Sequence, residues 1–538
     1  MNEEFHGAGL LERGFGQTAV ILVSILLLQV ARVAFAENSE QAPAERERTP
    51  MKGILYNEDD SHRFILAEPG KLTKEHLTGL VDELANSQVS AMLICCNAQR
   101  VNFPSKVWQW DSDGFDPAQG DDQPFFGDIS PEARVVMRKW AHNAMKLIAE
   151  GVDPTGIMLD RCREQGISPW VSIRMNDIHD ADLIKSPLHC AFWNENPQFW
   201  RYSNRFTAWT DRSFDYGQKP VRDRAMKLIV ELCERDDMEG LELDWMRFPL
   251  HFREGEEQAK AKELTEWMRE VRLVVNSAAK KRGHPILLVA RVAARPEVAS
   301  GIGTDAVTWA KEGLIDHLVV APFWATTDFD IPVEKWVELL AGTGVGVTAG
   351  LEIRVQPHPG SEVVDNTPER RRGAALSAMH RGSQGIYVFN YFEMGGTHPE
   401  LLQQMGSIET LLKKNRSHVV TYCDTCVPGK PIPAPLPRII EPGAEAVFFL
   451  HIGPKPANAR AEIVLEVKAG GEDAAKPEIE ALLNGKPGQL ETEAAGLSFA
   501  VGGEAFKEGY NEIAVRNKGA AKTTVTFVEL RVICAPEQ

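Results

Sequence analysis

The sequence predicts an α/β fold, a (β/α)8 TIM barrel followed by a small C-terminal β-sandwich of the jelly-roll type. Between about residues 52 and 415, short apolar runs alternate with helix-length amphipathic segments, and eight strand-like runs occur. Eight strands that are each followed by a helix-length segment are typical of a (β/α)8 barrel. The candidate strands cover residues 53–56, 91–96, 169–175, 240–245, 286–292, 317–323, 345–351 and 385–390.

Helical periodicity supports the barrel between these strands. The segments 220–235, 258–281 and 367–380 carry apolar residues at the spacing of an amphipathic helix. A doubly wound open sheet is the rival architecture. No glycine-rich phosphate turn follows the first strand, which favours the barrel. We therefore expect one barrel domain over residues 52–426.

After the barrel the sequence pattern becomes all-β. Residues 427–440 hold five prolines and predict a stiff linker. Alternating runs then follow, separated by turn pairs such as Asn484-Gly485. They cover residues 446–452, 461–467, 479–483, 512–516 and 523–532. A β-sandwich over 441–538 resembles the jelly-roll modules appended to carbohydrate enzymes, and both a structural cap and a sugar-binding role remain open.

The N-terminus carries a targeting pattern. An apolar run over 18–30 precedes Ala34-Phe35-Ala36, which predicts a signal peptide at 1–36 and a polar, disordered spacer at 37–51. The run is short for a membrane span, so we expect a secreted or periplasmic chain without one. The segment before this run contains Glu3, Glu4 and Glu12, whereas a signal peptide usually has a basic segment there. A lipid anchor or an uncleaved anchor therefore stays open.

Composition and cysteine spacing limit the partners. A net charge of -17 argues against nucleic acid. Cys423 and Cys426 form a single C-x-x-C pair, a weak zinc signal that could instead oxidise to a disulfide after export. The spacing of histidines matches no H-x-H or H-E-x-x-H motif. We therefore expect no cofactor and no catalytic metal.

The fourth strand is the most informative segment of the chain. Leu241, Leu243 and Trp245 lie on one face, and Glu242 and Asp244 lie on the other. An acidic face on a barrel strand points into a polar interior, and catalytic groups of barrels lie at the carboxyl ends of strands. Asp244 is therefore the first candidate catalytic carboxylate. A merely solvated acidic face is the alternative interpretation.

Glycoside hydrolysis needs a second carboxyl, one that stays protonated and acts as a general acid. Glu352, at the end of the seventh strand, is the first candidate, and Glu297 after the fifth strand is the second. A structural salt bridge from Glu352 to Arg354 or Arg247 remains an alternative. Glu242 lies deeper, where we expect it to be buried and paired with Arg174 or Arg291.

Polar residues end most of the other strands, which indicates one shared site. The residues predicted to bind substrate are Asn57, Asn97, Arg174, Asn176, Asp177, His179, Glu242, Arg247, Arg291, Trp324, Arg354 and Asn390. Some of the arginines must neutralise the inward acids, and any surplus would favour an anionic sugar. In the alternation along the sixth strand, Trp324 faces inward, where a sugar could stack on its ring.

Three segments carry a family resemblance: residues 170–179, 240–249 and 291–309. They resemble the glycosyl-hydrolase-like proteins described as family-10-like, which are secreted bacterial (β/α)8 barrels. Their fourth strand has the signature G-hydrophobic-E/H-hydrophobic-D-hydrophobic-hydrophobic-R-F/Y-P, and the resemblance covers about 52–415. It implies a retaining-type glycosidase fold and places Asp244 at the family's acidic position.

The sequence thus predicts a secreted glycoside hydrolase that cleaves a polysaccharide or oligosaccharide, with an anionic one left open. The alternative is a catalytically inactive barrel that serves as a glycan-binding or envelope protein. A second acid that faces Asp244 would favour the enzyme, and a mouth filled by arginine would favour the binding protein.

Overall fold

The computed structural model describes residues 51–391, 398–469, 477–492 and 496–535. The predicted signal peptide and nearly all of the predicted spacer lie in residues 1–50, outside the described residues. In the described part of the chain, no helix is long and apolar enough to cross a membrane.

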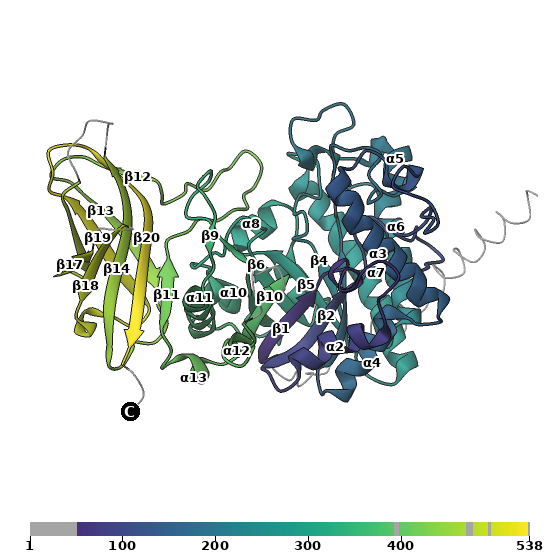
Figure 1. The fold of residues 1–538 in the computed structure, drawn as a ribbon, viewed down its shortest axis with the longest axis horizontal. Helices are drawn as coiled ribbons and strands as arrows, with labels where there is room; N and C mark the ends of the chain where they lie inside the picture. The colour runs from purple at the N-terminus through teal and green to yellow at the C-terminus, as the bar shows by residue number, and fades with distance from the viewer. Residues whose placement is uncertain (1–50, 392–397, 470–476, 493–495, 536–538) are drawn as a thin grey trace, which may run out of the picture. The chain divides into compact units, whose positions relative to one another are not determined.

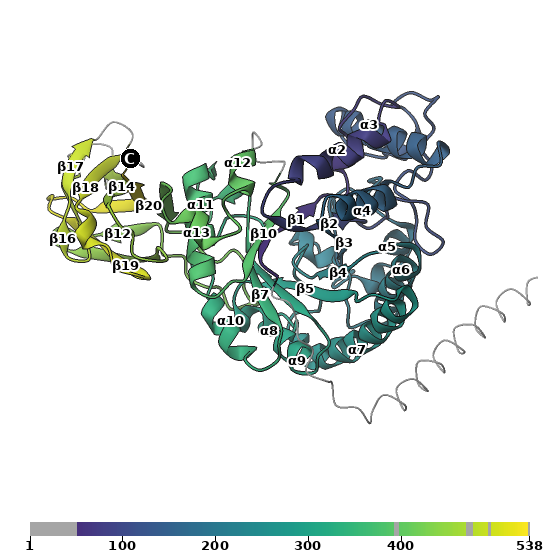
Figure 2. The same cartoon turned by 90° about the horizontal axis from the view of Figure 1, so that it is seen from below.

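Within residues 51–391 eight parallel strands close into a barrel, in the order β1-β10-β7-β6-β5-β4-β3-β2 (Figures 1 and 2). Each predicted strand overlaps one of them, so the predicted TIM barrel is confirmed. The strands are β1 (Gly53–Glu58), β2 (Val89–Cys95), β3 (Ser168–Arg174), β4 (Gly240–Asp244), β5 (Leu287–Ala293), β6 (His317–Ala321), β7 (Gly346–Leu351) and β10 (Gly385–Phe389).

Helices surround the strands, as Figure 2 shows. The three helices predicted above are found as α6 (Lys219–Arg235), α7 (Glu257–Arg282) and α11 (Pro368–His380). α7 ends where Gly283 takes a left-handed φ of 83°, which favours glycine. The other helices of the barrel are α2 (Lys74–Leu84), α3 (Pro131–Ala149), α4 (Pro154–Glu164), α5 (Ala191–Glu195), α8 (Pro296–Gly301), α9 (Ala306–Lys311), α10 (Val333–Leu339), α12 (Pro399–Leu402) and α13 (Ile408–Leu411).

Apolar side chains fill the amino-terminal part of the barrel interior. Trp170 is fully buried there and packs with Leu55, Val289 and Tyr387. A Cβ at Gly240 would lie 2.4 Å from the Trp170 ring, so only glycine fits beside it. Because this layer closes one end of the barrel, the polar residues gather at the other end, where the strands finish.

The C-terminal domain consists of two antiparallel sheets that enclose their own apolar core. The predicted β-sandwich is therefore confirmed. One sheet contains β11 (Arg416–Val419), β12 (Arg438–Ile440), β14 (Ala459–Ala469), β17 (Gln489–Thr492), β18 (Leu497–Val501) and β20 (Thr523–Cys534); the other contains β13 (Glu445–His451), β15 (Ile479–Leu483), β16 (Lys486–Pro487) and β19 (Tyr510–Asn517).

Strands on both sides of the proline-rich segment join the same sheet. β11 precedes the five prolines and β12 follows them, and both strands pair with β20. β11 also packs against α11 of the barrel, where Arg370 donates to Glu529 of β20 at 2.8 Å. The barrel and the sandwich are thus joined by direct contacts. All eight cysteines lie in described residues and are free thiols, including Cys423 and Cys426.

Candidate active site

Asp244 ends β4 and is fully buried. Its Oδ1 accepts the backbone N–H of Met246 at 2.9 Å and that of Arg247 at 3.1 Å. Its Oδ2 accepts Arg291 Nη1 at 3.0 Å. The turn that follows β4 therefore fixes the carboxylate in one orientation, because three N–H donors point at its two oxygens.

Arg291 joins Asp244 to a second acid. Its Nη2 donates to Glu352 Oε1 at 3.2 Å, and both acidic side chains are 1% exposed. Glu352 follows β7 directly, and its backbone carbonyl accepts bonds from Thr327 and Asn366. The partner of Glu352 is thus Arg291, where the sequence suggested Arg354 or Arg247. Among the described residues, Glu352 Oε2 has no hydrogen-bond partner.

Burial controls the protonation of Glu352 and Glu242. It raises the pKa of Glu352 to about 8, although the charge of Arg291 opposes the shift. Burial and then the negative charge of Asp244 raise the pKa of Glu242 to about 8. Both side chains are therefore mostly protonated at neutral pH.

The direct partners of Glu242 correct the sequence prediction. We expected Arg174 or Arg291, but Glu242 Oε2 accepts the Ser172 hydroxyl at 2.6 Å and the Tyr387 hydroxyl at 3.3 Å. A protonated carboxyl needs no cation, and the two hydroxyls satisfy Oε2, while Oε1 has no hydrogen-bond partner among the described residues. Glu242 thus lies below Asp244 as part of the buried hydrogen-bond network.

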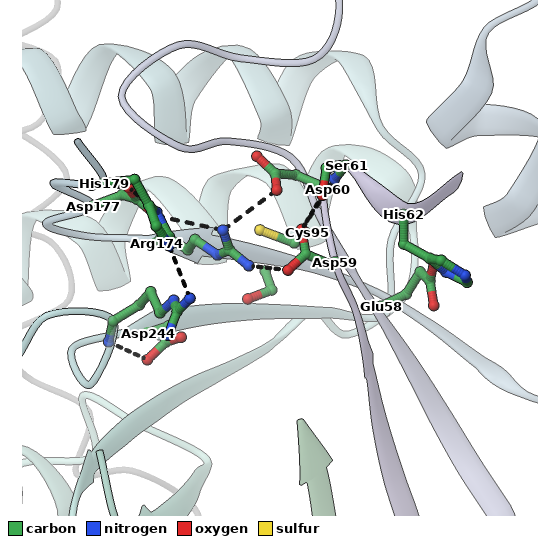
Figure 3. Close-up of polar contacts among 12 residues, drawn as sticks. Glu58, Asp59, Asp60, Ser61, His62, Cys95, Arg174, Asp177, His179 and Asp244 are labelled. Carbon is green, nitrogen blue, oxygen red and sulfur yellow. Dashed lines mark hydrogen bonds and ion pairs between the residues drawn. The ribbon is translucent and has the colours of Figure 1, made fainter. Parts of the chain in front are cut away.

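Arg174, at the end of β3, collects three acids (Figure 3). It pairs with Asp59 at 2.6 Å, with Asp60 at 3.3 Å and with Asp177 at 3.4 Å. Figure 3 shows Asp59 and Asp60 converging on this guanidinium, whereas Glu58 lies apart beside His62.

The neighbouring acids Asp59 and Asp60 differ in protonation. Burial alone would raise the pKa of Asp59, but the charge of Arg174 and the bonds from Asp60 and Ser61 hold it well below its usual value. Burial raises the pKa of Asp60 well above its usual value, and the negative charges of Asp59 and Asp177 raise it further against the opposing charge of Arg174. Of the two acids that share Arg174, Asp59 therefore ionises more readily and Asp60 holds its proton more tightly.

His179 connects Asp177 with Arg247. Its Nδ1 lies 2.8 Å from Asp177 Oδ1, and its Nε2 lies 3.1 Å from Arg247 Nη2. Because arginine only donates, we assign the proton of a neutral His179 to Nδ1. Despite burial, His179 and then Arg174 hold the pKa of Asp177 below its usual value. Arg247 forms no ion pair with any residue in the described ranges.

Phe389, at the end of β10, lies among the three arginines. Its ring centroid is 4.6 Å from the guanidinium carbon of Arg291, 5.2 Å from that of Arg247 and 5.9 Å from that of Arg174. Contact of a guanidinium with an aromatic ring is favourable, so the Phe389 ring offsets part of the repulsion between these neighbouring cations.

Four asparagines predicted to bind substrate, Asn57, Asn97, Asn176 and Asn390, are buried in the protein. Asn97 binds the backbone of Arg174 through both ends of its amide, and Asn176 binds the backbone of Phe214 likewise. Asn57 is buried in β1, and its Oδ1 has no partner among the described residues. Asn390 is buried with a left-handed φ of 47°.

Three predicted site residues stay outside the network around Arg291. Glu297 is exposed on the first turn of α8. Trp324 is 43% exposed, and the Arg354 guanidinium lies 4.3 Å from its ring centroid. The structure therefore brings Glu352 to Asp244 and leaves Glu297 at the surface.

Sequence reasoning missed several residues of the site. Asp424 accepts the backbone N–H groups of Phe323, Trp324 and Ala325 at 2.8–2.9 Å and so fixes the loop after β6. It lies about 100 residues away in the chain, and no local pattern indicates this contact. Tyr387 and Phe389 could have been found, because the alternation along β10 turns both inward.

A cavity of about 350 Å³ lies elsewhere, lined among others by Trp108, Phe192 and Arg224. It contains none of the predicted site residues. The chemistry of the Asp244 network therefore does not depend on this cavity.

No family model matches the chain, and no curated protein matches its sequence. Similar solved structures include a cycloisomaltooligosaccharide glucanotransferase from Paenibacillus sp. (8% identity, TM-score 0.33, 89% of this chain and 57% of that one). A second is the PgaB (BpsB) glycoside hydrolase domain from Bordetella bronchiseptica (10% identity, TM-score 0.39, 67% of this chain and 99% of that one). A third is the GH36 alpha-galactosidase AgaB from Geobacillus stearothermophilus (12% identity, TM-score 0.33, 88% of this chain and 56% of that one).

The similar structures are mostly glycoside hydrolases. The chain spans little more than half the length of the glucanotransferase and of AgaB. At these identities and TM-scores the chemistry has to be argued from the side chains of this chain.

Proposed function

We propose that the protein is a glycoside hydrolase whose carboxyl pair is Asp244 and Glu352. One observation carries the proposal: the two acids bind the two terminal nitrogens of Arg291, while burial raises the pKa of Glu352 to about 8. Two adjacent carboxyls of which one keeps its proton at neutral pH are what glycoside hydrolysis requires.

The roles follow from these environments. Glu352 donates its proton to the glycosidic oxygen as the bond from that oxygen to the anomeric carbon breaks. The Asp244 carboxylate faces the positive charge that develops at the anomeric carbon, and water supplies the hydroxyl that completes hydrolysis. Arg291 orients both acids. Because both are about 1% exposed, the side chains above them must move when the sugar enters.

The N-terminal sequence supports action outside the cytoplasm, on a polysaccharide or oligosaccharide. The runner-up is an inactive barrel that binds glycans. The observation in its favour is that Arg291 already occupies both acids of the pair. Turnover decides between the two proposals.

The test compares wild type with Asp244→Asn, Glu352→Gln and Glu297→Gln on neutral, uronic and sulfated polysaccharides, measured by released reducing ends. We expect Glu352→Gln to lose about 100- to 10,000-fold in kcat, the usual contribution of a general acid. Asp244→Asn should lose at least as much. Glu297→Gln is the matched control, an exposed glutamate that should retain activity.

Aryl glycosides with acidic leaving groups separate the two roles. Such leaving groups need no protonation, so Glu352→Gln should lose far less activity on them than on polysaccharides, and Asp244→Asn should lose as much on both. Unchanged turnover of Asp244→Asn on a substrate that wild type hydrolyses would refute the assignment. Absence of turnover with every substrate, together with glycan binding, would support the runner-up.

A further inference from the structure

Three aromatic rings form an open cluster beside Arg247, here called the aromatic platform: Trp209, Phe248 and Phe323. Trp209 stacks on Phe323 with centroids 5.8 Å apart and an interplanar angle of 23°. Phe248 contacts both rings, at 5.1 Å and 5.6 Å. The three residues follow β3, β4 and β6, which lie within one run of neighbouring strands, β6-β5-β4-β3, so the rings meet at one side of the barrel.

The platform is not ordinary core. Trp209 is 42% exposed, and Phe248 and Phe323 are half-buried. Phe248 also has a left-handed φ of 35°, which side-chain-bearing residues rarely adopt. The backbone N–H of Phe323 is held by Asp424. Strained backbone that persists next to a candidate active site is a reason to look for a role in binding.

An incompletely paired cation lies beside the platform. The Arg247 guanidinium carbon is 5.2 Å from the Phe248 centroid, and the His179 ring meets Phe248 edge-on at 5.1 Å. Arg174 pairs with three acids and Arg291 with two, whereas Arg247 pairs with none in the described ranges. Its Nε also lacks a partner among the described residues. Arg247 is buried, at 7% exposed, and the nearby charges of Asp177 and Asp59 compensate it without an ion pair. An anionic ligand therefore reaches its free donor only when the side chains that cover it move.

We propose that the aromatic platform and Arg247 form a subsite for an anionic pyranose ring. The C–H face of the sugar packs on Trp209, Phe248 and Phe323, and its carboxylate or sulfate binds Arg247. This inference rests on the proposed glycoside hydrolase and names its substrate class. The net charge of -17 disfavours non-specific attraction of polyanions, so binding of one requires a local cation.

The test is affinity electrophoresis of the full chain in gels that contain polygalacturonate, dextran sulfate or neutral dextran. The two anionic gels separate a carboxylate ligand from a sulfate ligand. The variants are Trp209→Ala and Arg247→Gln. Their matched controls are Phe449→Ala, which removes a ring 58% exposed on the β-sandwich, and Arg438→Gln, which removes an exposed arginine of β12.

Wild type should be retarded by at least one anionic gel and much less by dextran. Arg247→Gln should weaken that retardation about tenfold or more, the effect of losing a hydrogen bond to a charged group. Trp209→Ala should weaken it about threefold or more, because it removes one stacking ring. The two control variants should migrate as wild type does.

Three results would overturn the subsite: no retardation in either anionic gel, equal retardation in dextran, or wild-type retardation of both Trp209→Ala and Arg247→Gln. The outcome is separable from that of the proposed hydrolase. Retardation that depends on Trp209 and Arg247 without turnover would keep the subsite and refute the hydrolase. Hydrolysis of neutral glycans that neither substitution changes would keep the hydrolase and refute the subsite.

Discussion

Glu352→Gln should change how the stability of the protein depends on pH, and this prediction needs no substrate. Glutamine has the shape of a protonated glutamate but cannot ionise. In the folded chain burial raises the pKa of Glu352 from 4.5 to about 8. Between these values the folded state keeps a proton that the unfolded state has released.

The sign and size of the pH dependence of the free energy of unfolding follow from this difference in pKa. The stabilising contribution of Glu352 is complete below the unfolded pKa of 4.5 and is lost as pH rises through about 8. Across that window the free energy of unfolding falls by about 1.4 kcal/mol per pH unit for one such group. From about pH 5 to about pH 7.5, wild type should lose about 3 kcal/mol more than Glu352→Gln. Glu242 contributes equally to both proteins and cancels.

Urea unfolding followed by tryptophan fluorescence at several pH values measures the effect. Glu297→Gln is the control, because the exposed Glu297 side chain should leave the slope of wild type unchanged. Stability curves of wild type and Glu352→Gln that run parallel between about pH 5 and about pH 7.5 would show that Glu352 is ionised in the folded state. The general-acid assignment would then be wrong.

Two further substitutions test the surroundings of the pair. Arg291→Met removes the cation that Asp244 and Glu352 share, so the free energy of unfolding at neutral pH should fall by about 3–5 kcal/mol, as measured by urea denaturation; a loss below about 1 kcal/mol would contradict the bridging role. Asp424→Ala removes the acceptor of three backbone N–H groups after β6 and should cost about 2 kcal/mol, with Asp424→Asn costing less. Equal stability of the two Asp424 variants and wild type would mean that this loop is held by other contacts.

The inward-facing acids of β4 were predictable because side chains alternate along a strand. Leu241 and Leu243 are buried against the helices, and Glu242 and Asp244 face the interior, as the sequence indicated. The pairing of Asp244 with Arg291 was also within reach, since the two residues are register partners on neighbouring strands. Local alternation and strand order together determine such pairs.

The partner of Glu352 was not predictable from local sequence. Arg354 is two residues away, yet Glu352 turns inward to Arg291 while Arg354 lies against Trp324. Side chains two apart share a face only while the strand continues, and β7 ends at Leu351. Trp209 was missed for a related reason, because it begins a 3-10 helix of four residues (Trp209–Arg212), which is too short for a helical or strand periodicity to show.

The charges inside the barrel favour the hydrolase over an inert glycan-binding barrel. Among the described residues, contacts at the strand ends link five carboxyls with three guanidiniums, Arg247 through His179: Asp59, Asp60, Asp177, Asp244 and Glu352 with Arg174, Arg247 and Arg291. A sixth carboxyl, Glu242, lies below them on the hydroxyls of Ser172 and Tyr387 and interacts with Asp244 and Arg291 through charge. The network is neutral if Asp60, Glu242 and Glu352 keep their protons, which is the direction in which burial shifts their pKa values. A purely structural network needs only as many acids as arginines, because extra buried carboxyls add a desolvation cost. A surplus of acids that hold protons at neutral pH is what general acid catalysis requires, and one of the three lies beside Asp244 on the same arginine.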